Sequence, residues 1–321
     1  MNMFDITTTP DDVVHARERI RDRIRLTPVM TSDDINELLG IEVFFKCEHL
    51  QETGSFKLRG ATHAVSLLSD DCPGVATHSS GNHGAALARA ARTRGFQCHV
   101  VMPDSAVFSK VDAVRRHGGQ VHSCAPTQSA REAGLDRLTE QGYAPIPPYD
   151  DERIIAGQGS CALELMEQVP DLDALVAPIG GGGLISGLAL AVQSAPRPPR
   201  VYGVEPAGAD DTARSLKAGQ RVSDHDPRTM ADGLRALVGQ RNLAIIERDV
   251  LEVFTVSEAR ILEAMHLIWT HLKQVVEPSG AVALAGVVNR PERFAGMRLG
   301  VVLSGGNLDV EGMLKNLESS S

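Results

Sequence analysis

The fold class follows from the stretch GVATHSSGNHGAALARAARTRGFQCHVVM (residues 74–102). An apolar run at 74–77 is followed by an Ala-rich helical pattern at 84–94 and by a second apolar run at 98–102. A strand, a helix and a strand of these lengths form one βαβ unit, in which the two strands are parallel. The stretch therefore predicts an α/β fold built on a parallel sheet.

The same alternation of strands and helices extends outward from this stretch. It continues to residue 141, pauses in a segment with three prolines at 143–151, and resumes as far as the buried run at 299–303. Residues 1–72 contain too few strands to close a domain alone, so we expect them to join the second run. The sequence thus predicts two open parallel-sheet domains: a small, mobile, substrate-binding one at 73–147, and a large one formed by 1–72 with 148–321.

Composition excludes several classes of function. The chain has 321 residues, of which 42% are apolar and 23% charged, as is usual for a soluble enzyme. Its net charge is −9 without any basic block, so a nucleic acid is not an expected partner. No apolar run approaches the roughly 20 residues that span a bilayer, so a membrane is not expected either. The first nine residues lack the features of a secretion signal and the five cysteines are scattered, which predicts a cytoplasmic protein with reduced thiols.

A lysine with apolar neighbours lies in the stretch TGSFKLRGA (residues 53–61). Lys57 stands between Phe56 and Leu58, where a Gly-Ser turn meets the start of a helical pattern. Partial desolvation near a helix N-terminus would lower the pKa of this amine and make it nucleophilic. Taken alone, the stretch is equally compatible with an exposed lysine, because most lysines are exposed.

A glycine run between a buried strand and a helix predicts a phosphate site; it consists of Gly180, Gly181, Gly182 and Gly183. Backbone N–H groups can converge there without Cβ atoms in the way, and the helix start adds a positive dipole end. A flexible turn would need only one or two glycines. A dinucleotide site is the weaker alternative: Glu205 ends the next strand, but the G-x-G-x-x-G spacing fails at Ile185.

Two polar loops follow other predicted strands. The loop SSGNHG (residues 79–84) opens a helix, and its hydroxyl, amide and N–H groups could hold a carboxylate. A helix that is merely capped by Ser79 or Ser80 is the alternative. The loop SGGN (residues 304–307) follows the last strand and would let a flat ligand approach the backbone beside the hydroxyl of Ser304. Ligands of such sheets lie at the carboxyl ends of strands, where these loops are found.

The acidic loop EPAGADD (residues 205–211) could bind a cation. Glu205 and Asp211 stand six residues apart across a loop that contains a glycine, and a backbone carbonyl lies between them. Ligation by oxygen atoms alone suits Mg²⁺ or Ca²⁺. A solvated acidic loop without any ion is the alternative.

Taken together and in this order, the motifs GSFKLRGA, SSGNHG, GGGGL and SGGN resemble those of the fold type II pyridoxal-phosphate enzymes, which have the fold of the tryptophan synthase beta chain. More narrowly, the chain is similar to the serine racemase and serine/threonine dehydratase family, which includes the 3-hydroxyaspartate dehydratases. The resemblance covers nearly the whole chain. It implies pyridoxal 5'-phosphate in the cleft between the two domains, a small amino acid as the substrate, and a homodimer.

The resemblance also implies a role for each motif. Lys57 would carry the cofactor covalently and then act as the base at the substrate Cα, and Ser304 would meet the pyridine nitrogen. The other cofactor contacts would come from Phe56, Asn82, Gly180, Gly181, Gly182, Gly183, Leu184 and Glu277. The substrate carboxylate would be bound by Ser79, Ser80, Gly81 and His83. The divalent cation, Mg²⁺ or Ca²⁺, would be bound by Glu205, the carbonyl of Ala209, and Asp211.

These roles predict a pyridoxal-phosphate-dependent ammonia-lyase. It would remove water from a β-hydroxy amino acid (3-hydroxyaspartate, serine or threonine) and give an oxo acid and ammonia. Ser304 favours elimination, because a hydroxyl does not demand a protonated ring nitrogen and leaves the carbanion less delocalised. The alternative is an amino acid racemase with Lys57 and Ser80 as the two bases, since a serine at the position of Ser80 is the second base in the serine racemase group.

Two further alternatives and the substrate side chain are less well defined. One alternative is a β-replacement enzyme of the cysteine synthase type, but that group usually has TSGNTG where this chain has SSGNHG. The other is a catalytically inactive sensor, but such a protein would not need Lys57. A second substrate carboxylate would require a cation, for which Arg131, Arg153 and His78 are candidates. The dipeptide at 147–148 is Pro-Pro where relatives commonly have His-Pro, which makes the substrate harder to predict.

Overall fold

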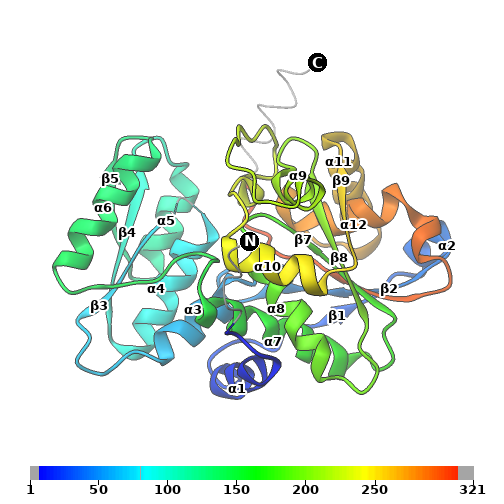
Figure 1. The fold of residues 1–321 in the computed structure, drawn as a ribbon, viewed down its shortest axis with the longest axis horizontal. Helices are drawn as coiled ribbons and strands as arrows, with labels where there is room; N and C mark the ends of the chain where they lie inside the picture. The colour runs from blue at the N-terminus through cyan, green and yellow to red at the C-terminus, as the bar shows by residue number, and fades with distance from the viewer. Residues whose placement is uncertain (1–6, 80, 310–321) are drawn as a thin grey trace.

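The computed structural model describes residues 7–79 and 81–309, and in these the chain forms two separate sheets (Figure 1). The six-stranded sheet has the order β1-β2-β10-β7-β8-β9, and the four-stranded sheet has the order β5-β4-β3-β6. Neighbouring strands are parallel except β1 and β2. The expected α/β fold with two open parallel sheets is thus confirmed.

The strands are short, as is usual for parallel sheets. The larger sheet consists of β1 (Val29–Met30), β2 (Glu42–Lys46), β7 (Ala174–Pro178), β8 (Arg200–Pro206), β9 (Glu252–Val256) and β10 (Arg298–Val302). The smaller sheet consists of β3 (Gly74–His78), β4 (Gln97–Pro103), β5 (Gln120–Cys124) and β6 (Ala144–Pro145). The smaller sheet therefore lies within the range 73–147, although the domain boundaries themselves stay a prediction.

Helices pack on both sheets and form the link between them (Figure 1). Those beside the smaller sheet are α4 (Asn82–Arg94), α5 (Phe108–Arg116) and α6 (Gln128–Glu140). Those beside the larger sheet are α1 (Pro10–Ile20), α2 (Asp33–Leu39), α7 (Glu152–Gln168), α8 (Gly183–Ala191), α9 (Asp211–Ala218), α10 (Gln240–Asp249), α11 (Glu258–Leu267) and α12 (Pro278–Asn289). Helix α3 (Lys57–Ser66) lies between α4 and α7, and its apolar side chains join the core beside the smaller sheet.

Some elements differ from the expectations drawn from the sequence. Residues 29–33 have the sequence pattern of a connector, but they contain the edge strand β1, and α2 follows with Ser32 as its N-cap. The proline-rich segment at 143–151 contributes the two-residue strand β6. The helical sequence pattern that begins at Ser257 extends to Leu272, but the chain leaves α-helical geometry at Ile268, in the π-helical turn η4 (Ile268–Leu272). These elements are short or irregular, so their apolar periodicity is too weak to detect.

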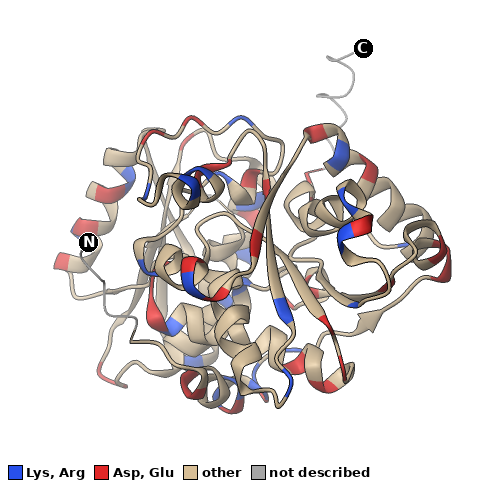
Figure 2. Ribbon diagram, turned by 45° about the vertical axis from the view of Figure 1, so that its right-hand side comes forward, with Lys and Arg blue, Asp and Glu red and all other residues tan. Residues whose placement is uncertain are grey.

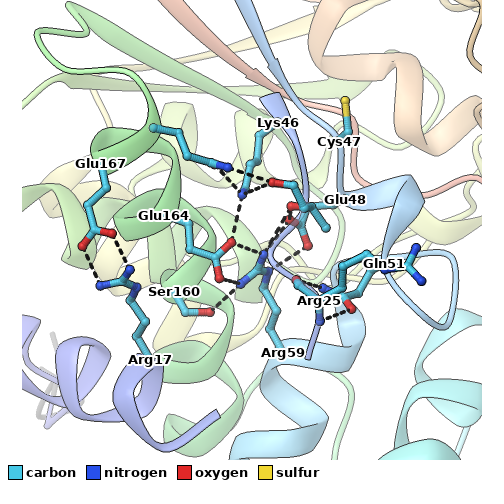
Figure 3. Close-up of polar contacts among 12 residues, drawn as sticks. Arg17, Arg25, Lys46, Cys47, Glu48, Gln51, Arg59, Ser160, Glu164 and Glu167 are labelled. Carbon is cyan, nitrogen blue, oxygen red and sulfur yellow. Dashed lines mark hydrogen bonds and ion pairs between the residues drawn. The ribbon is translucent and has the colours of Figure 1, made fainter. Parts of the chain in front are cut away.

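A buried ion cluster joins α3 to the larger sheet (Figure 3). The guanidinium group of Arg59 donates to both oxygens of Glu48, at 2.8 Å each, and to both oxygens of Glu164, at 2.8 and 2.6 Å. Lys46 in β2 donates to Glu164 at 2.8 Å and to the carbonyl of Thr27 at 2.9 Å. The charges of the four side chains sum to zero, and each side chain is at most 5% exposed. The cluster therefore fixes the first turn of α3 against β2 and α7.

The outer surface carries charges of both signs. Acidic and basic residues are interspersed along the outer helices (Figure 2). In the described part of the chain, no helix is both long enough and apolar enough to span a membrane.

Candidate active site

A cavity of about 980 Å³ is lined by residues of both sheet units. It brings together segments that are far apart in the sequence: the start of α3, the loop after β3, the glycine loop after β7 and the loop after β10. The predicted residues on its wall are Phe56, Lys57, Ser79, Gly81, Asn82, His83, Gly180, Gly181, Gly182, Gly183, Leu184, Glu277 and Ser304. Ser80, the predicted second base, lies outside the described residues.

Lys57 is the first residue of α3, and its amine faces the cavity. Nζ donates a hydrogen bond of 2.8 Å to the carbonyl of Pro148 and lies 5.0 Å from the ring centre of Phe56. Burial lowers the pKa of Lys57 to about 8, since a charged amine is poorly solvated there. The neutral amine that a nucleophile or base requires is therefore far more populated near pH 7 than in an exposed lysine, although the protonated form still predominates.

The glycine loop has the properties of an anion site. Helix α8 begins after Gly182, and no side chain caps its first N–H groups. Gly182 has φ +90°, which favours glycine, and a Cβ on Gly181 would lie 2.2 Å from the ring of Tyr149. The loop thus presents uncapped N–H groups and the positive end of a helix to the cavity, a donor set that fits a phosphate group.

Three polar residues meet on the wall between the two units. Asn82 Nδ2 donates to Glu277 Oε1 at 2.6 Å, and burial raises the pKa of Glu277. A Cβ on Gly305 would lie 2.1 Å from that carboxylate oxygen, so the loop after β10 needs glycine there. Ser304 Oγ donates to the carbonyl of Ser279 at 3.3 Å. The roles expected for Asn82, Glu277 and Ser304 toward a cofactor ring stay predictions.

The loop after β3 also brings the start of a helix to the cavity. Helix α4 begins after Gly81, which has no side chain, and the Ser79 hydroxyl accepts the N–H of Gly81, at 3.3 Å, rather than an N–H group of the helix. Ser79 therefore does not cap this helix, and Ser80, the other candidate cap, lies outside the described residues. His83 Nε2 donates to the carbonyl of Ile146 at 3.0 Å, and burial together with Lys57 lowers the pKa of His83 to about 3. His83 is thus neutral.

The structure distinguishes which of the three candidate cations is available to bind a second substrate carboxylate. Arg131 in α6 and His78 at the end of β3 both line the cavity. Among the described residues, the buried Nε of Arg131 has no hydrogen-bond partner. Arg153 is paired with both oxygens of Asp151, at 3.0 and 2.7 Å. Burial and the nearby Arg131 lower the pKa of His78, so the charged candidate is Arg131.

Sequence reasoning missed three residues of the site, namely Tyr149, Asn242 and Lys110. Tyr149 covers the glycine loop, and Asn242 in α10 donates to the carbonyl of Gly181 at 2.6 Å. Lys110 in α5 forms an ion pair with Asp232 on the opposite wall of the cavity. These three residues stand in helices or loops whose local sequence resembles ordinary surface.

Glu205, Ala209 and Asp211 of the acidic loop do not line this cavity. Glu205 at the end of β8 is buried, and its oxygens accept the N–H groups of Thr212 and Ala213 at 3.1 and 2.9 Å. Asp211 Oδ2 accepts the N–H of Val238 at 2.7 Å, while its buried Oδ1 has no hydrogen-bond partner among the described residues and lies 3.7 Å from His225 Nδ1. Burial, with Asp211 adding to it, raises the pKa of Glu205 to about 8. No cluster of three or more His, Cys, Asp or Glu side chains with metal-binding geometry occurs in residues 7–79 and 81–309.

Comparisons with known proteins agree with this geometry. The family described as "Pyridoxal-phosphate dependent enzyme" matches residues 20–305. The beta-hydroxyaspartate dehydratase of Paracoccus denitrificans is 50% identical, with 94% of this chain and 97% of that protein covered. The L-threo-3-hydroxyaspartate ammonia-lyase of Saccharomyces cerevisiae is 40% identical, with 95% of each covered. The solved structure of maize serine racemase has 38% identity and a TM-score of 0.93, with 98% of each chain covered.

Proposed function

Because the chain belongs to the family of pyridoxal-phosphate dependent enzymes, we propose that it is an ammonia-lyase for β-hydroxy amino acids with 3-hydroxyaspartate as its main substrate. The elimination releases water, and hydrolysis of the nitrogen-bearing product then gives an oxo acid and ammonia. The two relatives that are named for activity on hydroxyaspartate support the lyase. The observation that supports this substrate is the guanidinium of Arg131 on the cavity wall, whose buried Nε has no hydrogen-bond partner among the described residues.

The described residues fit the cofactor. The phosphate would be held by the glycine loop and the start of α8, with the ring between Phe56, Asn82 and Ser304. When bound, the cofactor supplies an electron sink for the bond that breaks at the substrate Cα. The amine of Lys57 would hold the cofactor and would act as the base that takes the Cα proton. Burial keeps its pKa near 8, so Nζ can both accept and return a proton near neutral pH.

The substrate would be oriented by its two carboxylates. The N–H groups at the start of α4, which no described side chain caps, would hold the α-carboxylate together with Ser79. Arg131 would hold the side-chain carboxylate, because a guanidinium binds a carboxylate through two parallel hydrogen bonds. Fixing both ends leaves the β-hydroxyl as the leaving group. The walls contributed by both sheet units limit the access of water.

The proposal is tested by oxo acid release from the threo and erythro 3-hydroxyaspartates and from both enantiomers of serine and threonine. We expect fastest release from one hydroxyaspartate isomer. Arg131→Met should lower kcat/KM for that isomer by about 10- to 100-fold, since one charge-assisted contact is lost, and should change serine turnover little. Arg137→Met on the exposed face of the same helix is the control. Equal losses for both substrates would remove Arg131 from side-chain recognition.

A racemase is the second candidate. The maize serine racemase structure supports it, although the two hydroxyaspartate relatives favour the lyase. Following substrate enantiomers by chiral separation in the same reactions measures this activity directly. We expect racemisation to be slower than oxo acid release.

We further propose that Glu205, the carbonyl of Ala209 and Asp211 hold Mg²⁺ or Ca²⁺. The support is chemical: two buried carboxylates lie within one short loop, and Asp211 Oδ1 has no hydrogen-bond partner among the described residues, with only His225 Nδ1 near it at 3.7 Å. Such oxygen ligands suit a hard cation. Adding either ion to chelator-treated protein should raise the melting temperature of the wild type but not that of Asp211→Asn. An equal rise in both proteins would contradict this site.

The expected homodimer and cytoplasmic location also remain proposals. The resemblance supports the dimer, and the five free cysteines support a reducing compartment. Sedimentation of the purified protein measures the first.

A further inference from the structure

The structure assigns to Asn242 a role that its sequence context does not reveal: it orients the glycine loop for the phosphate group of the cofactor. Asn242 stands in the first turn of α10 and is completely buried. Its Nδ2 donates to the carbonyl of Gly181 at 2.6 Å and to the carbonyl of Tyr149 at 3.3 Å. Asn242 therefore forms a hydrogen bond to the glycine loop from α10, a helix that is distant from this loop in the sequence.

The bond to Gly181 decides which way the next N–H group points. The carbonyl of Gly181 also accepts the N–H of Gly239, at 3.0 Å, so two donors hold it toward α10. In a trans peptide the carbonyl and the following N–H point in opposite directions. The N–H of Gly182 is consequently turned away from α10, and Gly182 lines the cavity. Without these donors, glycine peptides could rotate at little cost.

The packing around Asn242 supports a positioning role. A Cβ on Gly182 would lie 2.7 Å from the Cβ of Asn242, so the helix and the loop are in close contact. The carboxylate of Asp150 accepts the N–H groups of Gln240 and Arg241, at 3.0 and 3.2 Å, and fixes the start of α10. The preceding residue, Tyr149, covers Gly181 with its ring. The close contact with the glycine loop and the hydrogen bonds of Asp150 at the start of α10 thus hold Asn242 in place before any ligand binds.

The test compares two ligands that differ only in the phosphate group. Cofactor-free protein would be titrated with pyridoxal 5'-phosphate and with pyridoxal, and binding would be followed by absorbance. For Asn242→Ala we expect the Kd of pyridoxal 5'-phosphate to rise about tenfold, the effect of one hydrogen bond, and that of pyridoxal to stay within about twofold. Ser186→Ala is the control, because its buried hydroxyl contacts the backbone of Asn242 but not the loop.

A second variant distinguishes the loss of this hydrogen bond from a loss of the folded structure. Asn242→Asp keeps the shape of the side chain and replaces the donor by an acceptor, so it should also weaken pyridoxal 5'-phosphate selectively. Equal weakening of both ligands, or no weakening of either, in the folded variants would overturn the inference. The inference rests on the proposed function only for the identity of the phosphate-bearing ligand. Oxo acid release by the wild type tests the lyase separately, so the two can fail independently.

Discussion

Replacing Lys57 by Ala is expected to abolish turnover, with a fall of at least about a thousandfold in kcat. The amine is the only group on the cavity wall to which we assign both attachment of the cofactor and removal of the Cα proton. Loss of a positioned acid or base alone costs about 10² to 10⁴ in rate. The visible absorbance of the covalently bound cofactor should disappear together with oxo acid release.

The control for this variant is Lys217→Ala, which removes an exposed lysine of α9. It should keep full turnover and the absorbance of the wild type. The fold of the Lys57 variant is checked by its melting temperature, because only one hydrogen bond, that to the carbonyl of Pro148, is lost. Turnover retained by the folded Lys57→Ala protein would remove this residue from the mechanism.

Replacing Arg59 by Met is expected to lower the free energy of unfolding by about 3–5 kcal/mol, the usual cost of leaving a buried charge uncompensated. Burial alone would raise the pKa of Glu48, but Arg59 and then Lys46 outweigh it and keep the pKa below its ordinary value. Without Arg59, Glu48 loses both of its charged hydrogen bonds, and Glu164 retains only Lys46. Urea unfolding measured by circular dichroism gives the difference.

The surface pair between Arg17 and Glu167 provides the matched comparison (Figure 3). The two side chains are 31% and 60% exposed, so solvent screens their attraction. Arg17→Met should therefore cost less than about 1 kcal/mol. Similar losses for Arg17→Met and Arg59→Met would show that burial does not decide the strength of these ion pairs.

Arg59 illustrates how far a local motif can be interpreted. It stands two residues after Lys57 in a motif that identified the family, yet nothing in the stretch showed that it would be completely buried. Its partners lie 11 and 105 residues away, in segments that the sequence analysis did not connect. A charged residue is usually exposed, so only the observed burial and the two glutamates reveal its role.

The substrate side of the cavity shows the same limit. Sequence reasoning left Arg131, Arg153 and His78 open as partners of a second carboxylate. The structure pairs Arg153 with a neighbouring aspartate and leaves Arg131 on the cavity wall. A sequence shows which residues carry charge, but charge available to a ligand depends on which carboxylates the fold brings close.

The sequence by itself determined the α/β class, the two parallel sheets, and the four motifs that identify the pyridoxal-phosphate family. These features are local: strand and helix periodicity, glycine runs and a lysine beside a turn are complete within short stretches. Tertiary structure alone decided that Asn242 holds the glycine loop, that Arg59 is buried between two glutamates, and that Arg131 faces the cavity. Each depends on contacts between distant segments, and such contacts form only when apolar burial brings the helices and sheets together.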